Sequence, residues 1–468
     1  MTVQVEAAET HARHLRPEKV CIVGAGSSGI AAAQVLTARG IAFDCFEAGS
    51  QVGGNWRYLN DNGMSSAYRS LHINTSRQIM EYKSFPMSHE YPTYPDHRQI
   101  ARYFDSYVDH FGFRDRIQFG TAVSAVEPTG DGCWTVTTRR GADEAVITRY
   151  SAVIVANGHH WDARMPEPAF AGSETFTGTQ THSHHYKTFD AYEGKRVLVL
   201  GIGNSACDIA VETSKVSART FLAMRRGAHV VPKYIFGIPT DHLTTSPFAR
   251  APFHWMRRAS LNAILWMSRG KVTKYGLPKP DHKLLSAHPT ISDDLLTRLG
   301  HGDISVKPNI ARLDGDTVHF VDGSVEQIDS IVYCTGYKIT FPFFDEDFMA
   351  AHDNEVSLFH RVVDPAHPGL YFVGLVQPLG AIMPLAEAQS EWVADLLDGT
   401  ATLPSDQQMR TEINRYHRSQ RKRYVASKRH TIQVDFLDHL AEIKRERAAG
   451  RRRNGQSRQV TDRDSVSA

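Results

Sequence analysis

Several features that mark particular protein classes are missing from this chain. Its 468 residues include only five cysteines, which are odd in number, scattered, and without a CxxC pair. This pattern indicates neither a disulfide framework nor a zinc site, and it argues against a dithiol-based reductase. It also fits a reducing compartment, so a cytoplasmic protein is expected.

Long apolar runs and an excess of one charge are absent as well. No apolar run approaches the ~20 residues that span a bilayer, and residues 1–17 lack the apolar centre of a secretory signal. The formal charge of +2 predicts no polyanionic partner, and therefore no nucleic acid. With 41% hydrophobic and 22% charged residues, the composition favours a soluble enzyme of more than one domain.

Two basic segments lie near the C-terminus, RKRYVASKRH at 421–430 and AAGRRRNGQSRQ at 448–459. They contain few aromatic residues, and acidic residues lie between them. They therefore predict a solvated helix followed by a disordered basic tail over 446–468 rather than a nucleic-acid surface.

The most informative pattern is a glycine-rich turn near the N-terminus. KVCIVGAGSSG places Gly24, Gly26 and Gly29 after a short apolar run, and Glu47 closes the later run FDCFE. The first glycine permits a tight turn, the second lets backbone approach a pyrophosphate, and the third lets helix pack on strand. An acidic residue roughly twenty positions on accepts hydrogen bonds from a ribose. The motif predicts a dinucleotide site with Glu47 on the adenosine ribose.

A second turn of the same kind follows later in the chain. KRVLVLGIGNSACDIA places Gly201, Gly203 and Ala206 in the three small positions, and ARTFLAMRR ends at Arg225 and Arg226. Arginines at this position suit a 2′-phosphate, which favours NADP; the alternative is a solvated strand end. A single glycine motif is a weak signal, but two in strand–turn–helix context are much stronger.

These motifs predict an α/β fold of two Rossmann-like dinucleotide-binding domains, with the FAD domain split by an inserted NADP domain. The expected boundaries are listed in chain order: 1–165 for the first part of the FAD domain, 166–329 for the NADP domain with an irregular insertion at about 232–289, and 330–445 for the second part of the FAD domain. In this scheme the apolar strand in IDSIVYCTGY, 328–337, returns to the first domain.

The segment between the two turns carries a family resemblance. FTGTQTHSHHYK matches the FxGxxxHxxxY signature of flavin-containing monooxygenases through Phe176, Gly178, His182 and Tyr186. FEAGSQVGGNWRY, INTSRQIMEY, VIVANGHH, CTGYKITFPF, GLVQPLGAIMP and HTIQVDF are similar to that family in the same order. The resemblance, to the class B flavoprotein monooxygenases, covers about residues 18 to 445.

The resemblance implies FAD and NADPH as cofactors and assigns site residues to each. On the FAD side these are Gly24, Ala25, Gly26, Ser27, Ser28, Gly29, Glu47, Gly53, Gly54, Asn55, Trp56, Asn74, Thr75 and Gln377. On the NADP side they are Gly201, Gly203, Asn204, Ser205, Ala206, Cys207, Asp208, Arg225 and Arg226. Asn74 is the one candidate catalytic residue, while His182 and Tyr186 are expected to hold the segment between the domains.

The implied activity is oxygenation of soft nucleophiles, an amine nitrogen or a sulfide sulfur, using NADPH, O₂ and a flavin C4a-hydroperoxide. The alternatives are Baeyer–Villiger oxidation of ketones and an NADPH oxidase releasing hydrogen peroxide. Members devoted to ketones typically carry Trp where this chain has Tyr186, which disfavours that alternative. The expected partners are a small-molecule substrate and O₂, and proteins resembling this one are usually homodimers.

Two further segments have competing interpretations. A histidine cluster (His159, His160, His182, His184 and His185) matches no established ligand spacing, so no metal is predicted. The segment 253–270, FHWMRRASLNAILWMSRG, mixes bulky apolar and basic residues. A helix packed on its domain or on a second subunit is favoured over one lying on a membrane surface.

Overall fold

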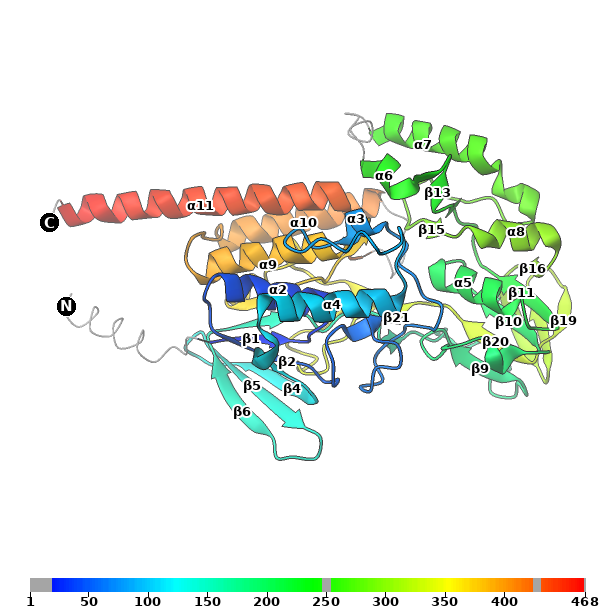
Figure 1. The fold of residues 1–468 in the computed structure, drawn as a ribbon, viewed down its shortest axis with the longest axis horizontal. Coiled ribbons are helices and arrows are strands. Elements are labelled where there is room, and N and C mark those ends of the chain that lie inside the picture. Colours follow the sequence, from blue (N-terminus) through cyan, green and yellow to red (C-terminus); the bar gives the residue numbers. More distant parts are fainter. Residues whose placement is uncertain (1–18, 246–253, 424–430, 467–468) are drawn as a thin grey trace.

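The computed structural model describes residues 19–245, 254–423 and 431–466, which contain two separate five-stranded parallel sheets (Figure 1). The first sheet has the strand order β22-β7-β1-β2-β3. Its strands are β1 (Val20–Val23), β2 (Phe43–Phe46), β3 (Ile117–Gln118), β7 (Ala152–Val155) and β22 (Leu370–Phe372). Every neighbouring pair is parallel.

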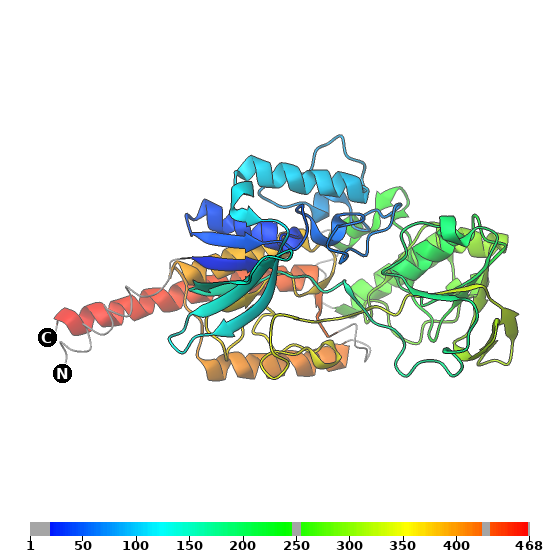
Figure 2. The ribbon, with the colours of Figure 1, turned by 90° about the horizontal axis from the view of Figure 1, so that it is seen from below.

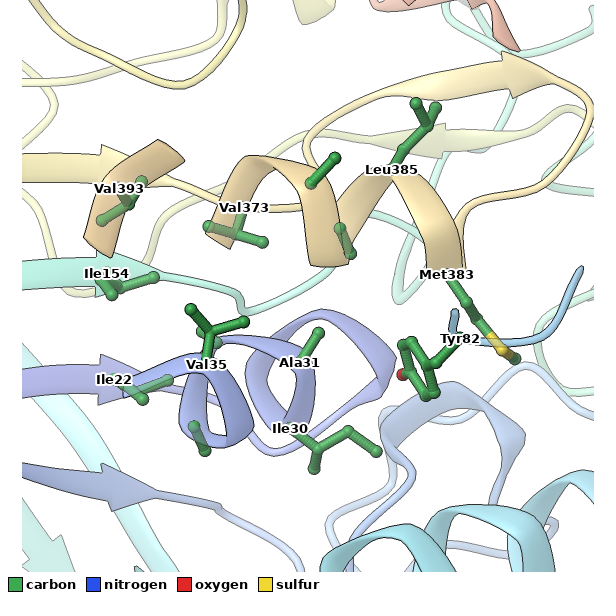
Figure 3. Close-up of a cluster of buried hydrophobic side chains, with 14 of the residues drawn as sticks. Ile22, Ile30, Ala31, Val35, Tyr82, Ile154, Val373, Met383, Leu385 and Val393 are labelled. Atoms are coloured by element: carbon green, nitrogen blue, oxygen red, sulfur yellow. The ribbon is translucent and has the colours of Figure 1, made fainter. Parts of the chain in front are cut away.

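Helix α2 (Ser27–Ala38) begins directly after the first glycine turn and packs against this sheet and against helix α9 (Met383–Leu397), which lies beside it in Figure 3. Small residues make this possible, because Ala31, Ala32 and Ala33 are all fully buried. A helix that is apolar on every side belongs inside a core. The helix that follows the turn is therefore held by both the sheet and α9.

The second sheet repeats the arrangement with the order β16-β11-β10-β20-β9, again all parallel. Its strands are β9 (Thr179–His182), β10 (Arg196–Leu200), β11 (Arg219–Ala223), β16 (Ile304–Lys307) and β20 (Ser330–Tyr333). Helix α5 (Asn204–Thr213) follows the second glycine turn, and α8 (Asp294–His301) packs beside it. The predicted fold class, two dinucleotide-binding units in one α/β chain, is confirmed.

One predicted boundary is wrong. The strand in 328–337 was expected to return to the first domain, but β20 pairs with β10 and β9 in the second sheet. The apolar run shows only that a buried strand exists, whereas the partner strands are chosen by the tertiary fold. The chain rejoins the first unit just after β20, where β21 (Tyr337–Lys338) pairs with β8 (Asp162–Ala163).

The C-terminal part also departs from expectation. Helix α11 runs from Phe436 to Val466, so most of the tail predicted to be disordered, 446–468, is helical. Figure 1 shows α11 extending well beyond the rest of the molecule. Its first half is anchored by ion pairs from Arg447 and Arg451 to the fully buried Asp395 of α9. The basic residues that suggested disorder thus include the anchors of a helix.

The insertion predicted at 232–289 contains regular elements as well as loops. They are β13 (Tyr234–Ile235), β14 (Ile238–Pro239), α6 (Thr240–Thr245) and α7 (His254–Arg269), and the insertion is closed by β12 (Val230–Val231) pairing with β15 (Thr290–Ile291). Leu261 and Leu265 of α7 pack into the insertion's own apolar cluster, as favoured for this segment, while Trp266 is 62% exposed. Residue 253, together with 1–17 and 424–430 of the segments discussed above, lies outside the described residues.

The remaining elements surround the two units. They are α3 (Arg77–Met80), α4 (His97–Phe111), α10 (Asp406–Arg423), the antiparallel sheets β4 (Thr121–Pro128), β5 (Trp134–Arg140), β6 (Val146–Tyr150) and β17 (Ile310–Asp314), β18 (Thr317–Phe320), β19 (Val325–Gln327), and the pair β23 (Gln377–Leu379) with β24 (Gln433–Asp435). Figure 2 shows the two units side by side, with α11 extending away from the second unit.

Candidate active site

A single cleft of about 1720 Å³ is bordered by both glycine turns. Parallel strands end at the same edge of a sheet, and ligands of open α/β sheets bind outside those ends. Most of the predicted site residues line this cleft: Gly24, Gly26, Ser27, Ser28, Glu47, Gly53, Gly54, Asn55, Trp56, Asn74, Gly201, Gly203, Asn204, Ser205, Ala206, Asp208, Arg225, Arg226 and Gln377. The fold therefore brings together residues from the whole length of the chain.

Four predicted residues lie just behind the wall of the cleft: Ala25, Gly29, Thr75 and Cys207. Gly29 is a packing position, because a Cβ there would lie 1.8 Å from the carbonyl oxygen of Gly24. Cys207 belongs to the apolar core of the second unit, and burial raises the pKa of its thiol well above the ordinary value. These residues support the two turns from behind.

The first glycine of each turn meets the same kind of obstacle. A Cβ on Gly24 would lie 2.8 Å from the carbonyl oxygen of Ala156, just after β7, and one on Gly201 would lie 2.7 Å from that of Cys334, just after β20. Both glycines also have positive φ, at 98° and 137°. Each turn is thus pressed against the end of a neighbouring strand, which leaves the helix N-terminus open toward the cleft.

Glu47 is held at the end of β2 by three donors. The Ala25 and Gly49 amides donate to its carboxylate at 2.8 Å each, to Oε2 and Oε1 respectively, and the Asn62 side chain donates to Oε1 at 3.2 Å. Burial raises the pKa of Glu47, and these donors oppose that shift. Because each carboxylate oxygen accepts about two hydrogen bonds, Oε2 keeps room for one more donor. A ribose hydroxyl is a donor that could fill this place.

The turn Gly53–Trp56 lies against the first glycine turn. Gly53 and Gly54 both have positive φ, and a Cβ on Gly54 would lie 3.2 Å from the Cα of Gly26. The Asn55 side chain accepts hydrogen bonds from the amide and hydroxyl of Ser66, each at 2.8 Å. Two backbone segments without side chains therefore lie against each other at the wall of the cleft, where a large ligand can approach the backbone closely.

Asn74 lies in the wall of the cleft on the loop that leads into α3. Its side-chain amide has no hydrogen-bond partner among the described residues, whereas the neighbouring Thr75 is buried. An amide that lines a cleft and is not engaged by protein can donate to a bound molecule. The geometry thus supports the role that the resemblance implied.

The second turn is tied to the insertion and to the first unit. Asn204 accepts a 2.8 Å hydrogen bond from the Ile291 amide, and Gly203 forms the N-cap of α5. Asp208 is partly buried, desolvation raises the pKa of its carboxyl group, and Tyr68 of the first unit donates a hydrogen bond to it. Asp208 is therefore a junction between the two units rather than only a helix-start residue.

Arg225 and Arg226 follow β11 after one intervening residue, Met224, and both border the cleft. Arg226 is half exposed and lies 3.4 Å from Asp281 of the insertion. Relative to the second glycine turn, the two arginines are in the position from which an arginine can bind the 2′-phosphate of NADP.

His182 and Tyr186, the signature residues between the turns, are buried and do not line the cleft. The Tyr186 hydroxyl donates to Glu212 of α5 at 2.5 Å. This agrees with a structural role. The five clustered histidines do not form a set close enough to share an ion; among the described residues, the only such group is His360, Glu412 and Glu442, elsewhere in the structure.

Some residues that line the cleft were not predicted from the sequence. Asn62, Tyr68, Arg164, Lys233 and Tyr337 all border the cleft. Tyr337 lies on β21 and belongs to the CTGYKITFPF motif, although the motif alone did not place it in the site. The other four belong to no spaced motif, and their approach to the site depends on the tertiary fold. Among those four, the only sequence signal was the position of Asn62 in a turn rich in Asn, Asp and Gly.

No helix within the described ranges combines the length and apolar character needed to cross a membrane. In both turns a side chain at the first glycine would collide with backbone. The acceptor expected beyond the first turn, Glu47, and the cations expected beyond the second, Arg225 and Arg226, border the cleft. Both turns therefore fit dinucleotides. FAD and NADP are the pair that a Glu-terminated and an Arg-terminated turn suit.

Comparison with known proteins gives a consistent result. Residues 17–452 match the flavin-binding monooxygenase-like family. The chain is 38% identical over 440 residues to flavin-containing monooxygenase 5 of Oryctolagus cuniculus, covering 91% of this chain and 82% of that protein. It is 34% identical over 444 residues to flavin-containing monooxygenase 2 of Homo sapiens, with the same coverage.

Solved structures show the same fold at low identity. S-allyl-L-cysteine S-oxygenase of Allium sativum matches with a TM-score of 0.69 and 22% identity over 94% of this chain and 93% of that one. OTEMO in complex with FAD and NADP matches with a TM-score of 0.69 and 15% identity over 93% and 98%. This chain therefore belongs to the flavin-binding monooxygenase-like family and is a flavin-dependent monooxygenase.

Proposed function

We propose that this monooxygenase uses NADPH and O₂ to oxygenate an amine nitrogen or a sulfide sulfur of a small molecule. One observation carries the proposal: both nucleotide turns open into one cleft, and Asn74, an unengaged amide, faces that cleft. Related proteins support the substrate class, since one is a dimethylaniline monooxygenase that forms N-oxides and another is an S-oxygenase.

The chain's own residues divide the work. When bound, the flavin supplies transfer of one oxygen atom from O₂ after reduction by NADPH. The helix N-terminus after Gly26 receives the pyrophosphate of FAD, and Glu47 accepts from its ribose. Arg225 and Arg226 receive the 2′-phosphate of NADPH, and Asn74 donates a hydrogen bond where charge develops beside the flavin.

The substrate itself needs no acid–base pair in this scheme, because a soft nucleophile already carries its reactive lone pair. What the protein must do is exclude water and keep both nucleotides in place. A homodimer and a cytoplasmic location stay predictions from the sequence.

The test measures product and hydrogen peroxide formed per NADPH with a tertiary amine, a thioether and a ketone. Wild-type protein is expected to oxygenate the amine or the thioether. Asn74→Ala should lower the oxygenation rate by about 100-fold, as loss of one positioned donor does, while NADPH is still oxidised and peroxide is released. Gln78→Ala, an exposed neighbour, serves as the control.

Oxygenation of the ketone alone would overturn the proposed substrate class. Peroxide release without product from any of the three substrates would identify an oxidase instead. An Asn74→Ala variant as active as the control would remove Asn74 from the mechanism.

A further inference from the structure

The insertion of the second unit reaches across to the loop that carries Asn74. Asp241 of α6 accepts hydrogen bonds from both the backbone amide and the hydroxyl of Ser76, at 2.7 and 2.6 Å. Both donors share the same carboxylate oxygen, Oδ2. His242 Nε2 lies 3.0 Å from the same hydroxyl. Two adjacent residues of the insertion therefore converge on one serine of the other unit.

Ser76 is a sensitive point for such a contact. It is fully buried, lies two residues after Asn74, and is the N-cap of the short helix α3. Its own side chain does not cap that helix, because its hydroxyl is directed to Asp241 instead. The end of the Asn74 loop is thus fixed by a carboxylate that belongs to another part of the fold.

The insertion also contacts the segment that lies beside this loop. The Tyr94 hydroxyl donates to the Lys233 carbonyl at 2.8 Å, and the Lys233 ammonium lies 5.0 Å from the Tyr94 ring centroid. The backbone on either side of Tyr94 pairs with both flanks of Asn74, through Ile73 N–H to Pro95 O at 3.0 Å and Arg77 N–H to Thr93 O at 2.8 Å. Both backbone segments around Asn74 are therefore bonded to the insertion.

We propose that Asp241 is a positioning residue, which holds the Asn74 loop through Ser76 and so makes the placement of the catalytic amide depend on the docked insertion. Asn74 has no side-chain hydrogen bond of its own among the described residues, so its position follows from the backbone around it. Asp241 does not line the cleft and acts only through that backbone. The inference rests on the proposed role of Asn74.

The first readout is independent of catalysis. Hydrogen exchange of the Ser76 amide is measured in the flavin-loaded protein for wild type, Asp241→Leu, which has no acceptor, and Asp241→Asn, which keeps one. Exchange is expected to rise about tenfold in the leucine variant and by much less in the asparagine variant, because a lost hydrogen bond opens the loop locally. Thr240→Ala is the control, since the Thr240 hydroxyl donates to the Pro232 carbonyl within the insertion and the substitution keeps the Thr240 backbone amide.

The second readout is the yield of oxygenated product per NADPH. Asp241→Leu should lower it at least about threefold with the KM for NADPH unchanged within about twofold, because a positioning loss affects the chemical step more than binding. Asp241→Asn should recover most of the yield, since its Oδ1 still accepts.

Unchanged Ser76 exchange in Asp241→Leu would overturn the proposal, and so would equal losses of yield in the asparagine and leucine variants. Failure of the proposed function is distinguishable from these results. In that case Asn74→Ala keeps its product yield, while the exchange of Ser76 still reports whether Asp241 holds the loop.

Discussion

Gly26 and Gly29 belong to one motif but serve different partners. The hypothetical Cβ of Gly29 collides with the protein, at 1.8 Å from the Gly24 carbonyl oxygen, whereas that of Gly26 meets only the Cα of Gly54 at 3.8 Å, an ordinary contact. Gly26 also has an extended backbone that any residue adopts. Gly29 is therefore required by the fold, and Gly26 by what enters the cleft.

This difference predicts opposite behaviour of two alanine variants. Gly29→Ala should lower the free energy of unfolding of the flavin-free protein by about 2–3 kcal/mol, because backbone must move to admit the methyl group. Gly26→Ala should leave that quantity within about 0.5 kcal/mol of wild type yet weaken FAD binding by about tenfold or more, since its methyl group stands where the pyrophosphate approaches. Denaturant unfolding and flavin titration measure the two effects. Equal destabilisation by both variants would contradict this assignment.

At the scale of elements, the attachment of α11 depends on one buried acid. Asp395 of α9 is fully buried and bonds to Arg39 of α2 and to Arg447 and Arg451 of α11. Burial alone would raise the pKa of Asp395, but hydrogen bonds from Arg447, Arg451 and Arg39 lower it to about 2. Three helices are thus joined by a carboxylate that stays ionised at neutral pH.

The depressed pKa gives a defined pH dependence. The unfolded-state value is about 3.9, so the stabilisation from Asp395 is present above that pH and is lost as pH falls toward about 2. Its size is about 2.5 kcal/mol at neutral pH. Asp395→Asn should lower the free energy of unfolding at pH 7 by about that amount and flatten the acid limb of stability against pH.

Asp398→Asn is the matched control for this experiment. Asp398 is partly exposed, pairs with Arg39 at 2.7 Å and accepts a hydrogen bond from the Thr400 amide, so its replacement by asparagine should cost less than about 1 kcal/mol. Unfolding curves measured between neutral and acidic pH check both variants. The interpretation fails if the two substitutions have the same effect, or if the acid limb is unchanged in Asp395→Asn.

At the scale of the whole molecule, the two units share one cleft, and each contributes one nucleotide turn to it. Arg225 and Arg226 of the second unit border the same cleft as Glu47 of the first. Contacts such as Tyr68 with Asp208 and Ser76 with Asp241 keep the units together. With the role proposed for Arg225 and Arg226, the second unit would select the nicotinamide nucleotide and the first unit would hold the flavin that it reduces.

Replacing Arg225 and Arg226 together by glutamine should raise the KM for NADPH by about tenfold or more and change the KM for NADH by less than about twofold, because only NADPH carries the 2′-phosphate. Steady-state kinetics with both nucleotides measure the effect. Arg219→Gln is the control, since Arg219 begins the same strand, is exposed, and pairs with Glu326 at 3.5 Å. An unchanged KM for NADPH in the double variant would disprove the assignment.

The sequence alone determined the two nucleotide turns, because glycine spacing, a preceding apolar strand and a trailing charge are all local. Gly24, Glu47 and Gly201 needed no tertiary information for that reason. It also determined the family through motifs in a fixed order, and Asn74 was found only by that route. Most of the residues assigned in this way border the cleft.

Only the tertiary structure decided which sheet receives β20, that α11 continues to Val466, and that Asp241 meets Ser76. In each case the partner lies far away in the sequence. A buried parallel strand has the same apolar pattern in either sheet. The basic sequence of α11 resembles a solvated tail, because the buried acid that anchors it, Asp395, lies in another helix. The contact between Asp241 and Ser76 produces no periodic pattern in the sequence, because it depends on how the two units pack and not on local conformational preference.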